Sequence, residues 1–551
     1  MEIKFFDYFS FLDKTKILYK INIIALREKA MKKKSMVFNI IIVLFLLLIV
    51  AMIFGNKKDS PLNPPRTLIN NNKPSYGVSS SNSLAVDVGM NVLRNGGNAI
   101  DAAIAVSYAL GVVEPYGSGI GGGGGMLIAK KDQKPTFIDY REMAPTSSQG
   151  KSSVPGFVAG MSYVHDKYGT KPMDELMQPA IDYAKKGFKV NNSLHSRLYN
   201  AIGRMDVKQL NNFYPKEEAI SEGEILKQPQ LTNTLVKIQH EDPKIFYKGE
   251  IAKDLVKHTS ISLDDLERYE VKEREPVISS YHGNEIISAP PPFSGVTLIQ
   301  MLKMADKKSI TTESTSNYYE KMNDIKTIAY KDRLQEIGDP AFYKQHAEML
   351  VSDKHIDQLI QGTEKEVNGA EDEEHESTTH FVVIDKDGTV VSTTNTLSNF
   401  FGIGKQVDGF FLNNNADTFG SKGINEREPG KRSRTFTAPT IMRAKGQWVM
   451  GVGSPGGTRI PQVLTQVLSE YMKDNKSLQE AVNQPRFIFD NDYIYVEPEL
   501  ETEDIPSSFH ISIKESDVFY GGVQALKKDF QQNRMDGAGD PRREGIWKMD
   551  N

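Results

Sequence analysis

The sequence contains no cysteine among its 551 residues. Disulfide scaffolds, thiol nucleophiles, cysteine-ligated zinc, iron–sulfur clusters and a lipidated N-terminal cysteine are therefore excluded. An excess of charge is also absent, because 67 lysines and arginines face 71 aspartates and glutamates, which gives a formal net charge of −4. This balance argues against binding of the whole chain to nucleic acid. The rest of the composition, 39% hydrophobic and 25% charged, is that of a globular protein.

Familiar catalytic and metal-binding signatures are missing as well. The chain has no HExxH zinc motif, no GxSxG nucleophile elbow and no EF-hand spacing, and we expect neither a metal nor a cofactor. The glycine run at 117–125 (GSGIGGGGG) contains GxGxxG, but a dinucleotide site needs a strand before the glycines and a helix after them. Here a helix is predicted first and a strand, at 126–129, second. The run therefore indicates a close-packed or ligand-lining backbone turn.

One long apolar run is present, at residues 38–54 (FNIIIVLFLLLIVAMIF). Its length is near the lower limit for a helix that spans a bilayer, and a buried core helix is the alternative. The flanking charges favour the membrane, because several basic residues precede the run and only Lys57 and Lys58 follow closely. By the positive-inside bias, the N-terminus stays in the cytoplasm and the chain after the run is exported. A cleaved signal peptide would share this pattern, but no small-x-small site follows, so we expect an uncleaved signal anchor.

These observations predict how the chain is divided before its main domain. We expect a cytoplasmic N-terminus at 1–37, a transmembrane signal anchor at 38–54 and a linker at 55–75 that is rich in Pro, Asn and Ser. Met31 is followed by three lysines and would itself begin a good export signal, so residues 1–30 are a candidate overextension of the start. The predicted location is the cell membrane, single-pass, with the rest of the chain outside.

From about residue 76 onward, helical and strand periods alternate. The expected elements are helices at 83–95, 99–113 and 460–472, a β-hairpin formed by 381–385 and 389–394, and a strand at 447–451. Asn98 is the expected N-cap of the second helix. The mixture indicates an α/β or α+β fold without a repeat of fixed period.

The segment 377–381 (STTHF) is a candidate for catalysis, because it enters the hairpin directly after an acidic run at 364–376. A threonine hydroxyl at such a position can attack the preceding carbonyl, shift the acyl group from nitrogen to oxygen and let water release the upstream segment. The new N-terminal threonine then carries both a nucleophile and a base, since its α-amine has a pKa of about 7.7–8.0. Taken alone, Thr-Thr before a strand is also explained by strand propensity.

Several motifs together resemble the γ-glutamyltranspeptidase family of N-terminal-nucleophile hydrolases. The likeness begins at residue 77 and its motifs follow the family's order: NGGNAIDAA (95–103), DYREMAP (139–145), VPGFVAG (154–160), PPPFSG (290–295), TTH (378–380), Asn395-Thr396 and GSPGG (453–457). The resemblance implies an α+β fold, a four-layer αββα sandwich, here preceded by one transmembrane helix. It also implies self-cleavage before Thr378 into a large segment, 76–377, and a small segment, 378–551. The two segments would stay paired as a heterodimer that transfers γ-glutamyl groups.

The resemblance implies roles for individual residues. Thr378 matches the nucleophile, and Thr396 matches the second threonine that hydrogen-bonds it. Gly456 and Gly457 match the oxyanion-hole donors, which fits backbone N–H groups at the entrance of a predicted helix. Arg141 matches the arginine that grips the substrate α-carboxylate. Taken alone, Thr396 would be an ordinary strand residue, the two glycines a tight turn and Arg141 a surface residue.

Two segments depart from the family members that act on glutathione. Those members hold the free α-amine of the γ-glutamyl group with an acidic residue, but the corresponding position in LNNNADTF (412–419) is Thr418. Asp417 lies one residue earlier and on a strand would face the other way. The loss of the carboxylate suits a donor whose nitrogen is already acylated, as inside a chain of γ-linked glutamates.

The second departure adds positive charge. The family's KRPLSS segment is KRSRTF (431–436) here, so Arg434 joins Arg432, and Thr435 and Phe436 replace two serines. Poly-γ-glutamate carries one free α-carboxylate per residue, which suits extra arginines, although a solvated basic turn is the alternative. Arg542 in DPRR (540–543) is a further candidate contact. Together the departures resemble the branch of the family that cuts the capsular poly-γ-glutamate of Gram-positive bacteria and transfers it to a cell-wall amine.

The leading hypothesis is an autoprocessing γ-glutamyl acyltransferase or hydrolase at a Gram-positive-type cell surface. Its donor would be poly-γ-glutamate or another γ-glutamyl peptide, and its acceptor a peptidoglycan amine or water. An exported glutathione γ-glutamyltransferase or hydrolase is the alternative within the same class. A non-catalytic, polymer-binding wall protein is the alternative from another class.

Overall fold

The computed structural model describes residues 74–310, 316–362, 377–473 and 476–551. The predicted cytoplasmic N-terminus, the apolar run at 38–54 and all but the last two residues of the linker lie outside these ranges, so the anchor stays a prediction. Among the helices of the described ranges, none is long and apolar enough to cross a membrane.

The first of two large sheets has the predicted hairpin at its centre. Its seven strands are all paired antiparallel in the order β20 (Ile546–Asp550), β1 (Tyr76–Ser80), β9 (Ser377–Ile384), β10 (Val390–Ser398), β2 (Gly123–Ala129), β3 (Thr136–Asp139) and β6 (Lys272–Arg274). The hairpin prediction is confirmed, and the structure extends β9 four residues toward the N-terminus. The first and last strands of the described chain thus meet beside β9.

The second sheet packs against the first. Its six antiparallel strands follow the order β19 (Arg534–Gly539), β18 (Gln524–Asp529), β14 (Trp448–Gly453), β13 (Thr440–Ala444), β8 (Asn284–Ser288) and β7 (Val277–Tyr281). Val382, Ile384 and Val390 of the first sheet share a buried cluster with Ile441 and Leu526 of the second. Alternation along a strand sends these residues to one face, so the two sheets bury a common apolar layer.

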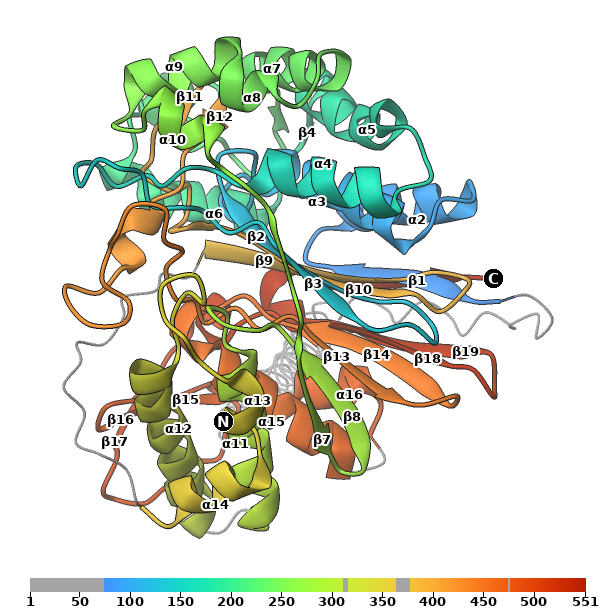
Figure 1. Ribbon diagram of the computed structural model, residues 1–551, viewed down its shortest axis with the longest axis vertical. Helices are drawn as coiled ribbons and strands as arrows, with labels where there is room; N and C mark the ends of the chain where they lie inside the picture. Colours follow the sequence, from blue (N-terminus) through green and yellow to red (C-terminus); the bar gives the residue numbers. More distant parts are fainter. Residues whose placement is uncertain (1–73, 311–315, 363–376, 474–475) are drawn as a thin grey trace, which may run out of the picture. The chain divides into compact units, whose positions relative to one another are not determined.

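Helices cover the outer face of each sheet, which gives four layers (Figure 1). The helices on the side of the first sheet are α2 (Ser83–Arg94), α3 (Ala99–Val113), α4 (Phe157–Tyr168), α5 (Met173–Lys186), α6 (Asn192–Ala201), α7 (Pro229–His240), α8 (Ile245–Lys248), α9 (Glu250–His258) and α10 (Leu263–Glu267). Those on the side of the second sheet are α11 (Gly295–Lys307), α12 (Ser316–Glu336), α13 (Ala347–Leu350), α14 (Asp353–Ile360), α15 (Ile460–Lys473) and α16 (Leu478–Asn483). The predicted mixed class and the expected order of layers are both present in these residues.

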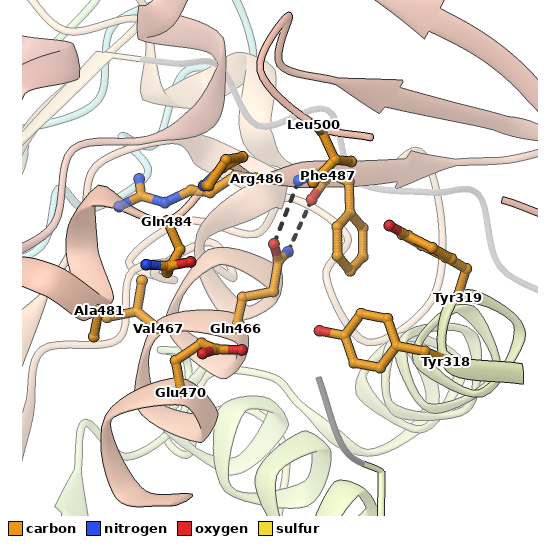
Figure 2. A pocket seen from close by; sticks show the side chains of 11 residues that line it. Tyr318, Tyr319, Gln466, Val467, Glu470, Ala481, Gln484, Arg486, Phe487 and Leu500 are labelled. Atoms are coloured by element: carbon orange, nitrogen blue, oxygen red, sulfur yellow. Dashed lines mark hydrogen bonds between the residues drawn. The ribbon is translucent and has the colours of Figure 1, made fainter. Parts of the chain in front are cut away.

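The described ranges also contain three small sheets. They are β15 (Phe487–Asp490) with β16 (Tyr493–Val496) and β17 (His510–Ile513), β4 (Phe188–Lys189) with β5 (Ile225–Leu226), and β11 (Gln406–Val407) with β12 (Phe410–Phe411). A pocket of about 150 Å³ lies where β15 meets α12, α15 and α16 (Figure 2). Gln466 lines this pocket and is fixed to β15, because its amide accepts from the Phe487 N–H at 3.3 Å and donates to the Phe487 carbonyl at 2.8 Å.

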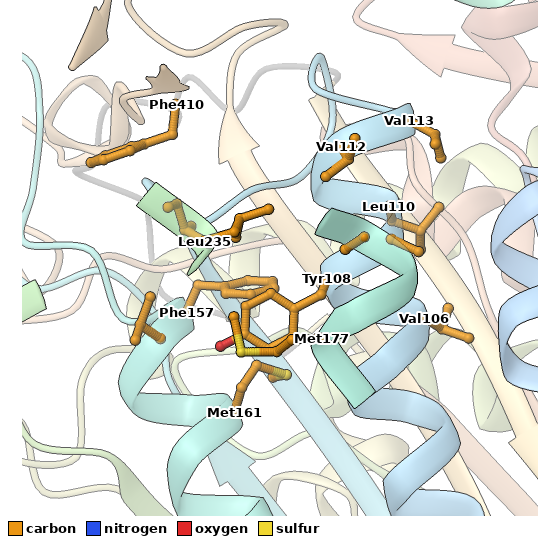
Figure 3. Close-up of a cluster of buried hydrophobic side chains, with 14 of the residues drawn as sticks. Val106, Tyr108, Leu110, Val112, Val113, Phe157, Met161, Met177, Leu235 and Phe410 are labelled. Carbon is orange, nitrogen blue, oxygen red and sulfur yellow. The ribbon is translucent and has the colours of Figure 1, made fainter. Parts of the chain in front are cut away.

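Helix α3 explains how the first outer layer is anchored. Its sequence is apolar all round, as expected of a helix buried on every side, and all but one of its residues are buried. The predicted cap is confirmed, because Asn98 and Asp101 form a reciprocal capping box. Tyr108 packs edge-on against Phe157 of α4 at 5.3 Å between ring centroids, within the cluster shown in Figure 3. This buried helix ends at residue 113, immediately before the turn that reaches the start of β9.

The glycine run begins its strand earlier than predicted. We expected the strand at 126–129, but β2 starts at Gly123 because Gly123 to Gly125 pair with Thr396 to Thr394 of β10. The approach is too close for side chains: a Cβ on Gly124 would lie 2.4 Å from the Thr394 carbonyl oxygen, and one on Gly122 would lie 2.1 Å from that of Thr396. The glycines are therefore a close-packed turn and strand beside the hairpin.

Candidate active site

The inner face of the β9–β10 hairpin changes from apolar to polar toward the start of β9. Residues 378, 380, 382 and 384 share the face that looks toward the second sheet, because side chains alternate along a strand. Val382 and Ile384 lie in the apolar layer between the sheets. Thr378 pairs in register with Thr396, and His380 pairs with Thr394. The candidate nucleophile thus lies at the polar end of a buried strand.

Thr396 contacts both the candidate nucleophile and the carbonyl that it would attack. The Thr378 Oγ1 lies 3.5 Å from the Thr396 Oγ1, which donates to the Ser377 carbonyl oxygen at 2.6 Å. The Ser398 N–H donates to the same Thr396 hydroxyl at 2.8 Å and so fixes its orientation. Both threonines are 4% exposed. In the uncleaved chain, a hydroxyl donor is therefore already aimed at the carbonyl between Ser377 and Thr378.

The turn after α3 also contacts the Ser377–Thr378 peptide bond, which is the junction to be cleaved. The Ser377 hydroxyl donates to the Tyr116 carbonyl. A Cβ on Gly117 would lie 3.5 Å from the Thr378 carbonyl carbon, so this glycine lies directly against the junction. The glycine-rich turn is thus part of the wall of the site, which agrees with a ligand-lining role but leaves that role a prediction.

His380 has a structural place beside the site. Its Nδ1 lies 2.8 Å from the Thr394 hydroxyl and its Nε2 lies 3.4 Å from the Ser392 hydroxyl. Burial lowers the pKa of His380 to about 3, so the ring is neutral at ordinary pH. A Cβ on Gly453 would lie 2.3 Å from the His380 ring, so glycine is needed there. The ring therefore joins β9 to the end of β14.

Gly456 and Gly457 follow this end of β14. Gly453 lies against His380, so the loop that follows Gly453 leaves the second sheet near the end of β9 at which Thr378 lies. Gly456 has φ 141° and Gly457 has φ 56°, conformations that favour glycine. Gly457 opens the short helix η4 (Gly457–Arg459), which continues directly into α15. The predicted position at a helix entrance is confirmed, and the oxyanion-hole role stays a prediction.

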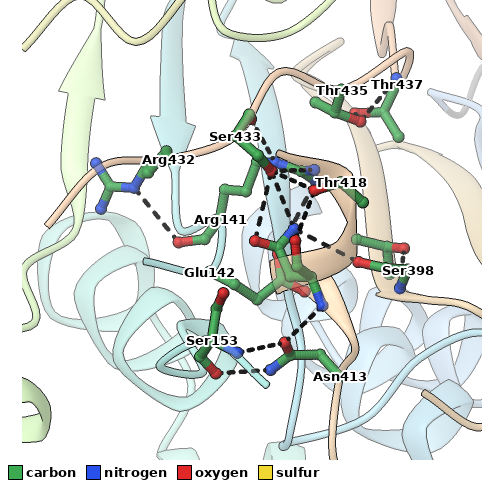
Figure 4. Close-up of polar contacts among 12 residues, drawn as sticks. Arg141, Glu142, Ser153, Ser398, Asn413, Thr418, Arg432, Ser433, Thr435 and Thr437 are labelled. Carbon is green, nitrogen blue, oxygen red and sulfur yellow. Dashed lines mark hydrogen bonds and ion pairs between the residues drawn. The ribbon is translucent and has the colours of Figure 1, made fainter. Parts of the chain in front are cut away.

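Arg141 and Thr418 meet at one side chain that the sequence did not single out (Figure 4). Arg141 is buried and donates through Nε to the Ser433 carbonyl and through Nη2 to the Ser433 hydroxyl, both at 3.0 Å. The Thr418 hydroxyl lies 2.6 Å from the same Ser433 hydroxyl. Asn415 donates to the Ser433 hydroxyl at 3.2 Å and to the Ser398 hydroxyl at 3.4 Å. A polar network thus runs from Arg141 to the residue that orients Thr396.

The expectation that Asp417 lies on a strand is wrong. Residues Asn415–Thr418 form the short helix η3, not a strand. Asp417 nevertheless points to the surface, where its carboxylate pairs with Lys151 at 3.2 Å. The buried position belongs to Thr418, which is 1% exposed.

The other three candidate arginines are held by protein groups in the uncleaved chain. Arg432 donates to the Glu270 carbonyl at 2.6 Å, and against the effect of burial it and Arg274 hold the pKa of Asp139 below its usual range. Arg434 donates to the carbonyls of Arg333, Leu334 and Ile337 at the end of α12. Arg542 pairs with Glu497 at 2.6 Å and with Asp540 at 3.2 Å. The basic-turn alternative is wrong for Arg432 and Arg434, because both are buried; contact with substrate stays a prediction for all three.

Comparisons with known proteins identify relatives of this chain. The family model for gamma-glutamyltranspeptidase matches residues 85–549. The capsule biosynthesis protein CapD proenzyme of Bacillus anthracis is 51% identical over 527 residues, which cover 94% of this chain and 98% of that protein. The glutathione hydrolase proenzyme of Escherichia coli (strain K12) is 34% identical over 465 residues, 74% of this chain and 80% of that protein. The crystal structure of cephalosporin acylase from Bacillus halodurans, at 25% identity, has a TM-score of 0.79 and covers 86% of this chain and 96% of its own.

Both the sequence match and the fold extend over nearly the whole described chain. The relatives named as proenzymes agree with a chain that matures by cleavage. The chain therefore belongs to the γ-glutamyltranspeptidase family, and it is a γ-glutamyl transferase or hydrolase with an N-terminal threonine nucleophile.

Proposed function

We propose that this enzyme cuts itself before Thr378 and then cleaves poly-γ-glutamate outside the cell, passing the acyl group to a cell-wall amine or to water. The observation that carries the self-cleavage is the contact of Thr396 with both the Thr378 hydroxyl and the Ser377 carbonyl. The donor class is supported by the likeness to a capsule biosynthesis protein and by the neutral side chain at Thr418.

Self-cleavage begins with attack of the Thr378 Oγ1 on the carbonyl carbon of Ser377. The Thr396 hydroxyl, which already donates to that carbonyl oxygen, stabilises the negative charge that develops on it. The C–N bond then breaks, the nitrogen takes up the hydroxyl proton, and an ester joins Ser377 to Thr378. Water hydrolyses the ester, which leaves a carboxylate on Ser377 and a free α-amine on Thr378.

The mature enzyme uses the same hydroxyl on its substrate. The α-amine of Thr378 takes the hydroxyl proton as Oγ1 attacks a γ-amide carbonyl of the donor. The N–H groups of Gly456 and Gly457 hold the oxyanion, and the departing nitrogen receives the proton. The resulting γ-glutamyl ester passes to an amine, with peptidoglycan as the proposed acceptor, or to water.

The donor is expected to be internal to a γ-linked chain. The Thr418 hydroxyl is bonded to the Asn415 carbonyl and to Ser433, and the side chain carries no charge. The site therefore has no carboxylate at this position that would favour a donor with a free ammonium group. Arg141 lies in the same network and is the proposed partner of the donor's α-carboxylate. Arg432, Arg434 and Arg542 are proposed to act on the polymer's further carboxylates or by holding the loops that do.

The two segments are expected to stay together after cleavage. In the first sheet, β1 of the large segment lies between β20 and β9 of the small segment, and β10 of the small segment pairs with β2 of the large one. Cleavage at Ser377–Thr378 therefore leaves two chains that share one sheet. We further propose that residues 38–54 anchor this heterodimer in the cell membrane with its catalytic part outside.

The test combines a gel with two donors. Wild-type protein should give two bands, the smaller beginning Thr-Thr-His-Phe on N-terminal sequencing, and Thr378→Ala should give one. The processed enzyme should shorten poly-γ-glutamate and release or transfer glutamyl groups. Turnover of glutathione with an untouched polymer would favour the exported glutathione hydrolase, the second candidate, which the likeness to the E. coli enzyme supports.

A further inference from the structure

The face of β9 opposite the nucleophile carries a second buried polar group. Thr379 points toward the helical layer, where its Oγ1 donates to Glu114 Oε2 at 3.0 Å and lies 3.2 Å from the Ser81 hydroxyl. Glu114 is the C-cap of α3 and is 1% exposed. Its carboxylate is thus fixed one residue along the strand from Thr378, and the mechanism above does not use it.

This carboxylate is not fully satisfied by the residues that the structure describes. Glu114 Oε1 is buried and has no hydrogen-bond partner among them. The charge of Arg197, a buried cation of α6, acts on Glu114 and lowers its pKa. An acceptor with unused capacity in a buried place is costly unless some other group or charge uses it.

Charged and polar groups from several elements act on the Glu114 carboxyl. Burial raises the pKa of Glu114, while the Ser81 and Thr379 hydroxyls, Arg197 and Arg543 of η6 (Pro541–Arg543) oppose this. Glu544, a second acid that acts on the adjacent Tyr116, follows η6. Burial outweighs these groups, so the pKa of Glu114 is raised overall, and a further cation beside the carboxyl would favour its ionised form.

We propose that Glu114 is the buried counter-charge for the α-ammonium that self-cleavage creates on Thr378. The inference rests on the proposed function, because that ammonium exists only after the Ser377–Thr378 bond is cut. In this role Glu114 is a positioning residue: it acts on the base without touching the substrate. The negative charge favours the protonated amine, so it sets the pH at which the base becomes available.

The consequence is a defined shift in the pH profile. The acid limb of kcat/KM against pH reports the loss of the proton from the α-amine of the free enzyme. At an effective dielectric constant of about 20, a unit charge roughly 12 Å away shifts a pKa by about one unit, and a nearer charge shifts it by more. Glu114 is bonded to the residue next to Thr378, so removing its charge should lower the pKa of that amine by about one unit or more. The acid limb of Glu114→Gln should therefore move to lower pH by about that amount.

The experiment uses the full-length, self-cleaved protein and a short γ-glutamyl amide as donor. Glu114→Gln and Glu114→Met both remove the charge at similar length, while Glu114→Asp keeps it. Asp385→Asn is the matched control, because Asp385 is a buried carboxylate at the other end of β9 that is bonded to the Ala99 and Thr389 N–H groups. The acid limb should move down in the two neutral variants and stay in place in Glu114→Asp and Asp385→Asn.

Three results would overturn the proposed role of Glu114. An unchanged acid limb in the neutral variants overturns the proposal, as does an equal shift in Asp385→Asn. A folded Glu114→Gln chain that stays uncleaved also contradicts it, because the assigned role begins after cleavage; if that variant is insoluble, Glu114→Met supplies the same test. A wild-type protein that gives one band and no turnover would instead refute the proposed function itself.

Discussion

The Thr396→Val substitution tests the cleavage geometry most directly. Valine has nearly the shape of threonine, so the change removes the hydroxyl and leaves the packing of β10 in place. It deletes the donor to the Ser377 carbonyl, the contact with the Thr378 hydroxyl and the acceptor of the Ser398 N–H. Loss of one preformed oxyanion donor typically slows an acyl transfer about 10²–10³-fold, or roughly 2.7–4 kcal/mol in activation free energy.

The assay is a gel time course of the conversion of the full chain into its two segments. Thr396→Ser should restore most of the rate, because it returns the hydroxyl. Thr393→Val is the control: it makes the same substitution three residues away on β10, where the buried hydroxyl has no partner among the described residues. This control should cleave at the wild-type rate. Wild-type cleavage in Thr396→Val would refute the reasoning that this hydroxyl stabilises the transition state.

Three further substitutions or conditions probe the surroundings of the site. Gly453→Ala places a Cβ 2.3 Å from the buried His380 ring and should cost about 1–3 kcal/mol in the free energy of unfolding, measured with urea against Gly203→Ala, whose Cβ would meet nothing. The unfolding free energy should also fall as pH decreases from about 6.5 toward 3. In this range His380 binds a proton in the unfolded chain, whereas the buried ring, with its pKa of about 3, stays neutral. His380→Gln should flatten that slope. Thr418→Asp should raise glutathione turnover relative to polymer cleavage in a competition assay, since it returns a carboxylate beside the donor's α-amine; an unchanged ratio would count against the assigned position.

Local patterns were enough to predict the elements that frame the site. The cap at Asn98, the apolar helix 99–113 and the hairpin around Gly388 each depend on residues close together in the chain. The start of β2 could not be predicted in this way. Its glycines are needed because the Thr394 and Thr396 carbonyls approach from a strand that lies some 270 residues later.

Side-chain partners were harder to predict for the same reason. Arg432 and Arg434 suggested a polyanion site, yet their partners in the structure are carbonyls of distant residues, Glu270 and the end of α12. Ser433, between them, was passed over although it joins Arg141 to Thr418. Glu114 had no sequence signal at all, because a lone glutamate after a helix is ordinarily a surface residue.

The interleaving of the strands constrains how the proposed enzyme matures. Since β9 pairs with β10 along its whole length and with β1 from Phe381 onward, the bond before Thr378 can be cut while the strand stays hydrogen-bonded. The new α-amine is therefore created on a residue whose hydroxyl already contacts Thr396 and whose neighbour Thr379 is bonded to Glu114. A nucleophile at a loose chain end would have to be ordered on substrate binding, at a cost in conformational entropy. Here the entropy is lost when the sheet folds, before any substrate binds. A threonine without a histidine or aspartate partner can therefore serve as both nucleophile and base.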